Sequence, residues 1–364
     1  MNIKPKILDI YIIRKFIGTF LFSLGLIILI AIVFDTSEKL DDFLEREAPL
    51  RAIVFDYYLN FIPFFGNLFS PLFIFISVIF FTSRMAGNTE VIAIFASGIS
   101  YKRFLLPYVI AAFFLASLSL YLNNWVLPHS NVKRTAFELK YIKNPFVYKH
   151  RNVHRQIQPG QYIYFESYNN FDKIGYQFSF EKMENGKLKY KLLSDRIIWD
   201  TLKNKWTIEN YFIRRIDSIT EVIESGYRMD TTFVFKPTDF ERRVDYAVET
   251  MDFKELNRFI SEERMRGSDE LVFYLIEKYK RVSYPFATFI LTLMGVAISS
   301  RKVRGGIGAQ LGFGILLSFT YIMFMQVSTT FATNGNAPPM LAVWIPNIVF
   351  SIVAIYLLRK RINT

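Results

Sequence analysis

Residues Phe16–Phe34 read FIGTFLFSLGLIILIAIVF, and no charged side chain interrupts this run. An α-helix rises about 1.5 Å per residue and the hydrocarbon core of a bilayer is about 30 Å thick, so roughly 20 apolar residues are enough to span it. A charge at the centre of such a helix costs roughly 2.5–3.5 kcal/mol on insertion scales, which makes its absence informative. The stretch therefore predicts a membrane-spanning helix.

The same pattern returns along the chain. Tyr57–Ser83, Phe104–Pro128 and Val282–Ser300 contain no charged residue. The run Gly305–Leu358 is also free of charge, but it is far too long for one span. Its polar, proline-containing middle at Thr333–Pro339 is expected to break it into a helical hairpin. The sequence therefore predicts six spans.

The composition agrees with a membrane protein. Hydrophobic residues make up 52% of the chain and aromatic residues 17%, with 38 phenylalanines. The chain has no cysteine, which excludes disulfides, iron–sulfur clusters and thiol-ligated zinc without fixing the compartment. The net charge of +12 would suit nucleic acid, but the positions of the basic residues indicate membrane topology instead. No nucleic-acid partner is expected.

Basic residues mark one side of the predicted membrane. That side holds Lys4, Lys6, Arg14, Lys15, Arg84, Lys102, Arg103, Arg301, Lys302, Arg304, Arg359, Lys360 and Arg361. Only Asp9 and Glu90 oppose them, whereas the first loop on the other side, residues 35–56, is mainly acidic. Cytoplasmic loops are enriched in lysine and arginine, so the basic side is expected to be cytoplasmic, with both termini inside. The first span lacks a small-residue cleavage site and is expected to stay as an anchor.

A long polar stretch lies between the third and fourth spans. It divides the chain into residues 1–128 with three spans, 129–280 as an inserted domain outside the cytoplasm, and 281–364 with three more spans. Alternating aromatic and polar residues predict strands at Gln161–Tyr168, Tyr176–Lys182, Lys187–Leu193, Arg196–Asp200, Lys205–Arg214 and Thr232–Lys236. The expected fold is an α-helical polytopic membrane protein with an inserted all-β domain.

Two further features of the inserted domain are predicted. Glu184-Asn185-Gly186 is typical of a hairpin turn, and the short, unequal strands favour a sandwich or jelly roll over a barrel. Residues Asp252–Arg266 have the pattern of an amphipathic helix. Its apolar face is expected to carry Phe253, Leu256, Phe259 and Ile260.

The cytoplasmic stretch between the second and third spans is the most informative loop. Residues near 88–98 predict a short amphipathic helix, with Asn88 as its N-cap and Glu90 in the first turn, where the helix dipole favours an anion. Gly98 is expected to end this helix and Ser100 to cap the next. The apolar positions are Val91, Ile92, Ile94 and Phe95. Such a helix fits a groove on a cytoplasmic partner or lies in the lipid interface, and the pattern alone leaves both open.

Motifs for independent chemistry are missing from the sequence. It has no Gly-x4-Gly-Lys-[Ser/Thr], Gly-x-Ser-x-Gly or His-Glu-x-x-His. His150 and His154 have helical spacing, but no carboxylate follows at a suitable distance, so polar residues at a domain boundary are favoured over a metal site. No carboxylate lies within a predicted span, which disfavours a proton-driven transporter. No cofactor is expected, and any energy source must belong to a partner.

Several motifs occur in an order and spacing that are similar to one known family. They are Leu8-Asp9-x-Tyr11, Glu90-Val91 through Ala96-x-Gly98-x-Ser100, Trp125-Val-x-Pro128, Arg281-x-x-x-Pro285 and Pro338-Pro339-x-x-Ala342-x-x-x-Pro346-Asn347. From about residue 6 to residue 361 the chain resembles the LptF/LptG (YjgP/YjgQ) permeases, the membrane subunits of the lipopolysaccharide-exporting ABC transporter. The inserted strands resemble that family only in their position and strand richness.

The resemblance implies a mechanism and a set of partners. Two such subunits face each other, with spans one and five lining a lateral opening for the lipid. A cytoplasmic LptB-like ATPase dimer grips the coupling helix of each subunit. Lipopolysaccharide leaves the inner membrane, reaches the periplasmic β domain and passes to bridge proteins similar to LptC and LptA. The permease itself is not an enzyme on this view.

The resemblance also implies roles for individual residues. The ATPase-coupling residues would be Glu90, Val91, Ile94, Phe95 and Gly98. The lipid-contacting wall of span five would be Leu311, Phe313, Leu316, Phe319, Met323 and Phe324, although ordinary helix packing explains the same pattern. Family members place basic residues at the outer end of span one, but this chain has Asp35, Glu38, Asp41 and Asp42 there, with Lys39 alone. Lys39 stays a possible charge contact for the lipid, and Lys133, Arg134 and Lys140, just beyond span three, are the better candidates.

Two other classes of function compete with export. A membrane-anchored scaffold or sensor would use the β domain to bind a partner, but six spans and a coupling segment exceed what anchoring requires. A membrane-embedded enzyme would need a catalytic pair within the spans, and the sequence shows none.

Overall fold

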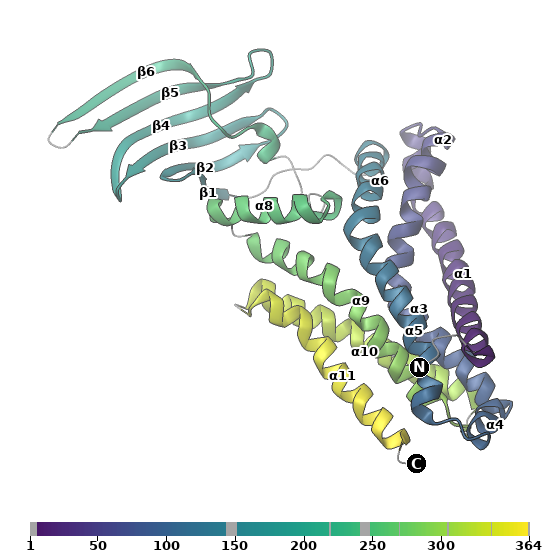
Figure 1. Ribbon diagram of the computed structural model, residues 1–364. Helices are drawn as coiled ribbons and strands as arrows, with labels where there is room; N and C mark the ends of the chain where they lie inside the picture. Colours follow the sequence, from purple (N-terminus) through teal and green to yellow (C-terminus); the bar gives the residue numbers. More distant parts are fainter. Residues whose placement is uncertain are drawn as a thin grey trace. The chain divides into compact units, whose positions relative to one another are not determined.

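The computed structural model describes residues 6–142, 151–217, 220–240, 248–268, 270–303, 306–335 and 337–362. The chain divides into two compact units. One is helical and combines the chain up to residue 142, residues 249–253 and the chain from residue 272 onward. The other contains residues 143–248 and 254–271 and holds the strands (Figure 1).

Within the described residues, six helical segments are long and apolar enough to cross a membrane, which confirms the six predicted spans. The first span is α1 (Ile7–Glu45). The second contains α2 (Leu50–Ala52), the π-helix η1 (Ile53–Tyr58) and α3 (Leu59–Gly87), and the third contains α5 (Tyr101–Tyr121), the π-helix η2 (Leu122–Val126) and α6 (Leu127–Tyr141). The last three are α9 (Leu271–Ser299), α10 (Gly306–Asn334) and α11 (Pro339–Ile362). A short helix, α4 (Glu90–Ala96), joins the second and third spans.

Helix α3 is central to the packing of the helical unit. On one side Phe81 stacks on Tyr108 of α5, with ring centroids 5.5 Å apart, and Phe16 of α1 completes the cluster. On the other side Ile79 meets Gly314 of α10, where an added Cβ would clash with the isoleucine side chain. Without a hydrophobic driving force between helices in lipid, such close approach at small residues is what holds spans together.

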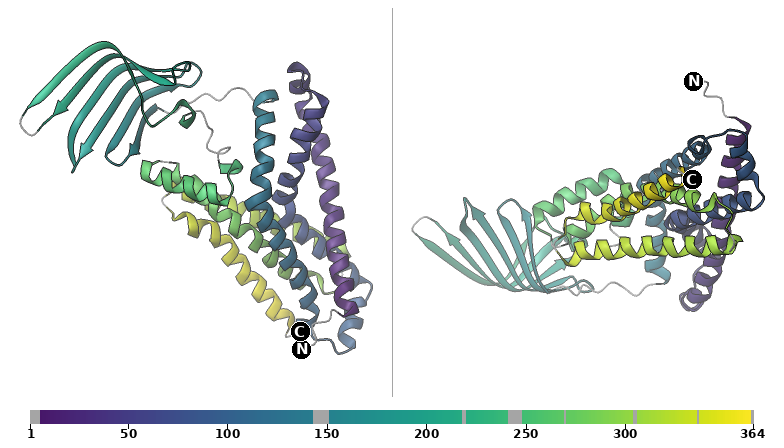
Figure 2. Two further views of the ribbon diagram at one scale, coloured as in Figure 1. Left: turned by 45° about the horizontal axis from the view of Figure 1, so that its top comes forward. Right: turned by 90° about the horizontal axis from the view of Figure 1, so that it is seen from below.

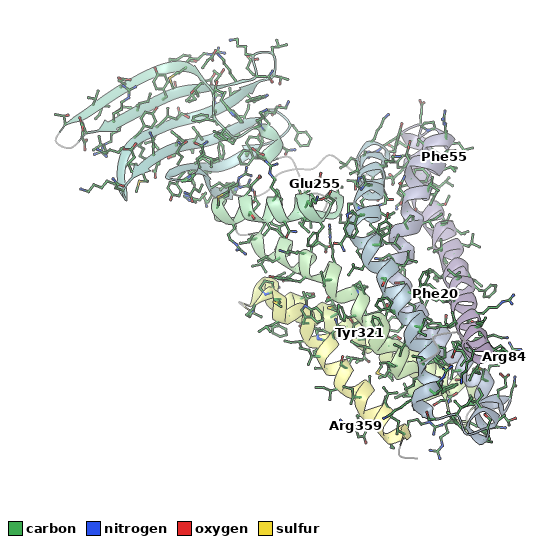
Figure 3. The ribbon with its side chains drawn as sticks, viewed as in Figure 1. Phe20, Phe55, Arg84, Glu255, Tyr321 and Arg359 are labelled. Carbon is green, nitrogen blue, oxygen red and sulfur yellow. The ribbon has the colours of Figure 1, made fainter. Side chains whose placement is uncertain are left out.

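The ends of several spans meet at one end of the helical unit. Arg361 near the end of α11 donates to the Ser300 carbonyl oxygen at 2.8 Å, and the Ser300 hydroxyl lies 3.5 Å from the Tyr101 hydroxyl at the start of α5. Figure 3 shows Arg84 and Arg359 toward this end and Phe55 toward the other. Arg84, Arg359 and Arg361, three of the basic residues that the sequence assigns to one side of the membrane, therefore lie toward the same end of the helices.

The second unit is built on one antiparallel sheet. Its strands are β1 (Arg151–Gln158), β2 (Gln161–Asn169), β3 (Ile174–Glu184), β4 (Lys187–Asp200), β5 (Lys205–Ile216) and β6 (Glu221–Thr231). Each strand pairs with the next along the chain, in the order β1-β2-β3-β4-β5-β6 (Figure 2). The predicted hairpin turn between β3 and β4 is confirmed, because Asn185 and Gly186 have φ angles of 50° and 74°.

The sheet corrects four details of the sequence prediction. Strand β4 is continuous through both Lys187–Leu193 and Arg196–Asp200, and strands β1 and β6 were not predicted. Among the described residues there is one sheet, so the expected sandwich or jelly roll is replaced by a meander. The turns between strands are short, and a short turn brings each strand back beside its predecessor in the same sheet.

Residues Thr232–Lys236, predicted as a strand, do not form one. They cross the apolar face of the sheet, where Phe233 and Phe235 pack in the cluster around Phe165, Phe178 and Trp206. The Trp206 indole nitrogen donates to the Phe235 carbonyl oxygen at 3.0 Å. The alternating phenylalanines thus satisfy their apolar character by covering the sheet, which period-two patterning cannot distinguish from joining it.

Helix α8 (Phe253–Arg266) forms where the amphipathic pattern predicted a helix. Leu256 and Ile260 are buried, and Phe259 is partly buried. Phe253, expected on the same face, is the first residue of the helix and is exposed.

Candidate functional site

The short helix α4 differs from its prediction in the residue that precedes it. Asn88 follows the end of α3 and does not cap α4; the residue before α4 is Thr89, which has a left-handed φ of 63° and no capping side-chain bond. The left-handed backbone at Thr89 interrupts the helical geometry between α3 and α4. Gly98 has a φ of 82° after α4, and the Ser100 hydroxyl accepts the Arg103 amide at 3.3 Å, both as expected.

The apolar face of α4 packs on its own chain. Val91 is buried, and Ile94 and Phe95 pack partly buried against the same cluster of α1, α3 and α5 side chains. The ring centroids of Phe95 and Phe104 are 5.4 Å apart. The outward surface of α4 is formed instead by Ile92, Ala93 and Ala96. The assignment of Glu90, Val91, Ile94, Phe95 and Gly98 to ATPase coupling stays a prediction.

Two polar contacts tie the start of α1 to α4 and to the start of α5. The Tyr11 hydroxyl donates to the Glu90 carboxylate at 2.8 Å. Arg103, at the start of α5, donates from both terminal nitrogens to the two Asp9 oxygens at 2.6 Å each. Asp9 is buried, so this bidentate pair is the geometry in which a charge pair is strongest. Both contacts join residues far apart in sequence, and no local pattern pointed to them.

The predicted lipid-contacting residues of α10 divide into two groups. Phe313, Leu316, Phe319 and Met323 are half or more exposed, and the last three follow helical spacing along one face. Leu311 and Phe324 pack against the cluster formed with α3, α9 and α11. The exposed face is therefore narrower than the sequence suggested.

The predicted charge contacts also divide. Lys39 pairs with Asp35 and the Tyr57 hydroxyl, and Arg134 pairs with Glu249 at 2.9 Å while lying 3.9 Å from the centre of the Phe64 ring. Both cations are therefore engaged within the chain. Lys133 is exposed, and the Lys140 ammonium lies 4.8 Å from the centre of the Tyr141 ring. Of the four candidates, these two are the more accessible.

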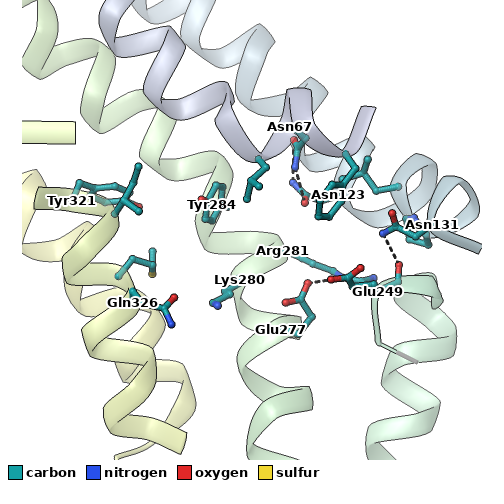
Figure 4. Close-up of a pocket in the computed structure, with 16 residues that line it drawn as sticks. Asn67, Asn123, Asn131, Glu249, Glu277, Lys280, Arg281, Tyr284, Tyr321 and Gln326 are labelled. Carbon is teal, nitrogen blue, oxygen red and sulfur yellow. Dashed lines mark hydrogen bonds and ion pairs between the residues drawn. The ribbon is translucent and has the colours of Figure 1, made fainter. Parts of the chain in front are cut away.

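A polar pocket of about 340 Å³, which the sequence did not predict, lies in the helical unit (Figure 4). It is formed by α3, η2, α6, α9 and α10 together with Glu249. Its polar lining residues are Asn67, Asn123, Asn131, Glu249, Glu277, Lys280, Arg281, Tyr284, Tyr321 and Gln326. The available signal was the set of amide side chains within apolar spans, because polar residues are expensive there and are retained mainly for function.

The walls of the pocket are held by hydrogen bonds between helices. Asn67 of α3 donates to Asn123 of η2 at 3.0 Å and accepts from the Ser119 hydroxyl at 2.9 Å. Tyr321 of α10 donates to Asn347 of α11 at 2.8 Å. The π-helical turn η2 widens the third span at this level, and such turns occur frequently at functional sites.

Other polar groups of the pocket have no partner among the described residues. The Asn131 amide nitrogen donates to the Glu249 carbonyl oxygen at 3.0 Å, but its Oδ1 is buried without a hydrogen bond. Lys280 and Tyr284, which lie on α9, make no side-chain hydrogen bond or ion pair within the described part of the chain. The pocket thus has walls held in place by hydrogen bonds between helices, and it has polar groups that are available to bind a ligand.

The family model of the lipopolysaccharide export system permease LptF/LptG matches residues 10–360 of the 364. This chain belongs to the LptF/LptG family. The match extends over all six spans and the inserted sheet, which confirms the resemblance inferred from the motifs. No individually curated protein matches the chain.

Membership of the LptF/LptG family makes the chain a permease subunit of lipopolysaccharide export and a multi-pass protein of the inner membrane. In the described part of this LptF/LptG chain, no three His, Asp or Glu side chains are grouped to hold a metal. His154 lies on strand β1 against the Tyr164 ring, so the helical spacing assumed for the pair does not apply to it. His150 lies outside the described residues.

Proposed function

We propose that this chain works as one of two facing permease subunits in an ATP-driven exporter. It extracts lipopolysaccharide from the inner membrane and delivers it through its β domain to a periplasmic bridge. Hydrolysis belongs to a separate cytoplasmic ATPase dimer. The family assigns lipopolysaccharide export, and the steps beyond that assignment are the proposal.

The main support for the proposal is that the six spans are buried within the chain to different extents. Only 11% of the most apolar window of α1 and 22% of that of α10 are buried within the chain, against 33% to 61% for the other four spans. These are spans one and five, the pair that we propose to line a lateral opening for the lipid. Helices that pack so little on their own chain are suited to face a second subunit and the lipid between the two.

The coupling segment supports a link to an external ATPase. Ile92, Ala93 and Ala96 form a small exposed apolar surface on α4, suited to a groove on a soluble partner. Glu90 contacts Tyr11, so a displacement of α4 is passed directly to the start of α1. A force applied at the cytoplasmic end would thereby reach the span that borders the proposed opening.

The orientation rests on charge. Arg84, Arg301 and Arg359 belong to the basic loops and terminus at the α4 end of the helices, which we assign to the cytoplasm. The inserted sheet then lies in the periplasm, where it can receive lipid.

Reconstitution tests the proposed function. The chain would be incorporated with a second LptF/LptG-like subunit and its ATPase into vesicles containing lipopolysaccharide. A photo-crosslinker at Tyr164 on β2 should capture lipid with ATP and little without it. Equal capture in both conditions, or no capture, would refute export and favour a scaffold that uses the sheet to bind a partner.

A further inference from the structure

We propose that the polar pocket of the helical unit binds a phosphorylated sugar, with Lys280 contacting the anionic group. This inference rests on the proposed function, because it takes the sugar to be part of the exported glycolipid. It adds a binding site within a single chain, separate from the surface of α10 that faces outward.

Of the cations that line the pocket, Lys280 has no ion-pair partner among the described residues. Arg281 donates to the Met251 carbonyl oxygen at 2.9 Å and lies 3.9 Å from Glu277. Glu249 is paired with Arg134 at 2.9 Å. Lys280 has no such partner among the described residues, and Figure 4 shows it between α9 and Gln326 of α10. An ammonium with three donors and no protein acceptor suits a phosphate.

The uncharged groups of the pocket suit a sugar. Asn131 Oδ1 is an acceptor without a partner, although only 3% of the residue is exposed. The Tyr284 hydroxyl and the Gln326 amide can each donate and accept. A sugar hydroxyl also does both, so several of these groups can be satisfied by one ring. Buried polar atoms are usually hydrogen-bonded in native proteins, and among the buried unpaired side-chain atoms of the described residues Asn131 Oδ1 is the one whose residue lines this pocket.

The size and the rim of the pocket limit what enters. A volume of about 340 Å³ is near the lower end of the 300–1,000 Å³ of small-molecule sites, which fits one phosphorylated sugar unit and not a whole glycolipid. Leu68 of α3 and Ile322 of α10 line the pocket and are both exposed. An apolar rim of this kind lets acyl chains remain in the bilayer while the head group enters.

Binding to the full-length chain in nanodiscs tests the inference. The probe is a synthetic diacylated glucosamine 1-phosphate. It is compared with the same lipid lacking phosphate, with water-soluble glucosamine 1-phosphate and with phosphatidylglycerol. Lys280→Gln should weaken binding of the phosphorylated glycolipid about tenfold, as expected for one charge-assisted hydrogen bond, and leave the phosphate-free lipid unchanged. Lys280→Arg should retain binding.

Two matched variants complete the design. Lys278→Gln changes the same residue type on the same helix outside the pocket, and should bind as the parent does. Asn131→Ala and Tyr284→Phe should weaken both glycolipids. Unfolding temperatures of all variants identify any that fail to fold, and for those Lys280→Arg carries the comparison. Binding of the soluble sugar phosphate with the same Lys280 dependence would support the site and show that acyl chains are dispensable.

Several outcomes would overturn the inference. These are unchanged binding in Lys280→Gln, equal losses in Lys278→Gln, or phosphatidylglycerol binding with the same dependence on Asn131 and Tyr284. The proposed function is judged separately by ATP-dependent capture at Tyr164. If Tyr164 captures lipid with ATP but Lys280→Gln binds the phosphorylated glycolipid as the parent does, only the proposed pocket is refuted. If Lys280→Gln weakens binding but Tyr164 shows no ATP-dependent capture, only the proposed exporter is refuted.

Discussion

Arg103 donates a hydrogen bond from each terminal guanidinium nitrogen to a different carboxylate oxygen of Asp9, each at 2.6 Å. The contact joins the start of α5 to the start of α1 across 94 residues of sequence. Two residues further along α1, the Tyr11 hydroxyl donates to the Glu90 carboxylate of α4 at 2.8 Å. Together they connect the first span to the third span and to α4, the helix that is proposed to meet the ATPase.

Breaking the ion pair should destabilise the helical unit. Arg103→Met leaves a buried carboxylate without its partner, and the expected loss is about 1.5–3 kcal/mol, the usual range for a hydrogen bond to a charged group. Thermal unfolding of the detergent-purified chain measures it. Lys102→Met, a neighbouring exposed cation, should have no effect. Asp9→Asn combined with Arg103→Met should recover part of the loss, and a fully additive loss would show that the two side chains do not interact.

Two positions on α4 should fail in different ways. Ile92→Asp places a charge on the exposed surface and should abolish co-purification with the ATPase while leaving the unfolding temperature unchanged. Phe95→Ala removes a ring that packs on Phe104 and should lower stability by about 1–3 kcal/mol, less than the roughly 3–5 kcal/mol of a fully buried phenylalanine. If Phe95→Ala loses the ATPase with full stability and Ile92→Asp retains it, the docking face has been assigned to the wrong side.

The two halves of the α10 pattern can be separated by photo-crosslinking. A crosslinker at Phe319, which is 55% exposed, should capture lipid or a second permease subunit in membranes. One at Phe324, which packs against its own chain, should give mainly intramolecular products. Equal intermolecular capture at both positions would contradict the packing of α10.

The membrane orientation can be tested without any assay of function. The chain has no cysteine, so a single cysteine gives a clean signal. Cysteines at Asn185 and Leu202, in two turns of the sheet, should react with an impermeant maleimide in intact spheroplasts. A cysteine at Val303 should react only after permeabilisation. Labelling of Val303 from outside would reverse the assignment made from the basic loops.

The segment that covers the sheet should contribute to the stability of the inserted domain. Trp206→Phe keeps a buried ring but loses the hydrogen bond to Phe235, with an expected cost of about 1 kcal/mol. Phe235→Ala should cost about 3–5 kcal/mol. Near-ultraviolet circular dichroism during denaturation of the full chain follows both. Val234→Ala, an exposed position between the two phenylalanines, is the control and should change little.

Local features of the chain were predictable because their physics is local. The charge-free run at Phe16–Phe34 specifies a span wherever it lies, and Asn185-Gly186 specifies a tight hairpin turn. Ser100 caps α5 for the same reason, since its hydroxyl reaches an amide three residues away. Six spans, their family and the position of the strands followed from patterns of this kind.

The tertiary structure alone decided which partner each patterned residue takes. Phe233 and Phe235 alternate as a strand does, yet they cover the sheet, because their rings pack in its apolar cluster. Phe95 turns inward and Ile92 outward, although both belong to one apolar stretch. Lys280 is a candidate site residue only because α3, η2 and α10 contribute the other walls of its pocket. Hydropathy and turn chemistry act over a few residues, whereas packing and ion pairing depend on which distant residues the fold brings together.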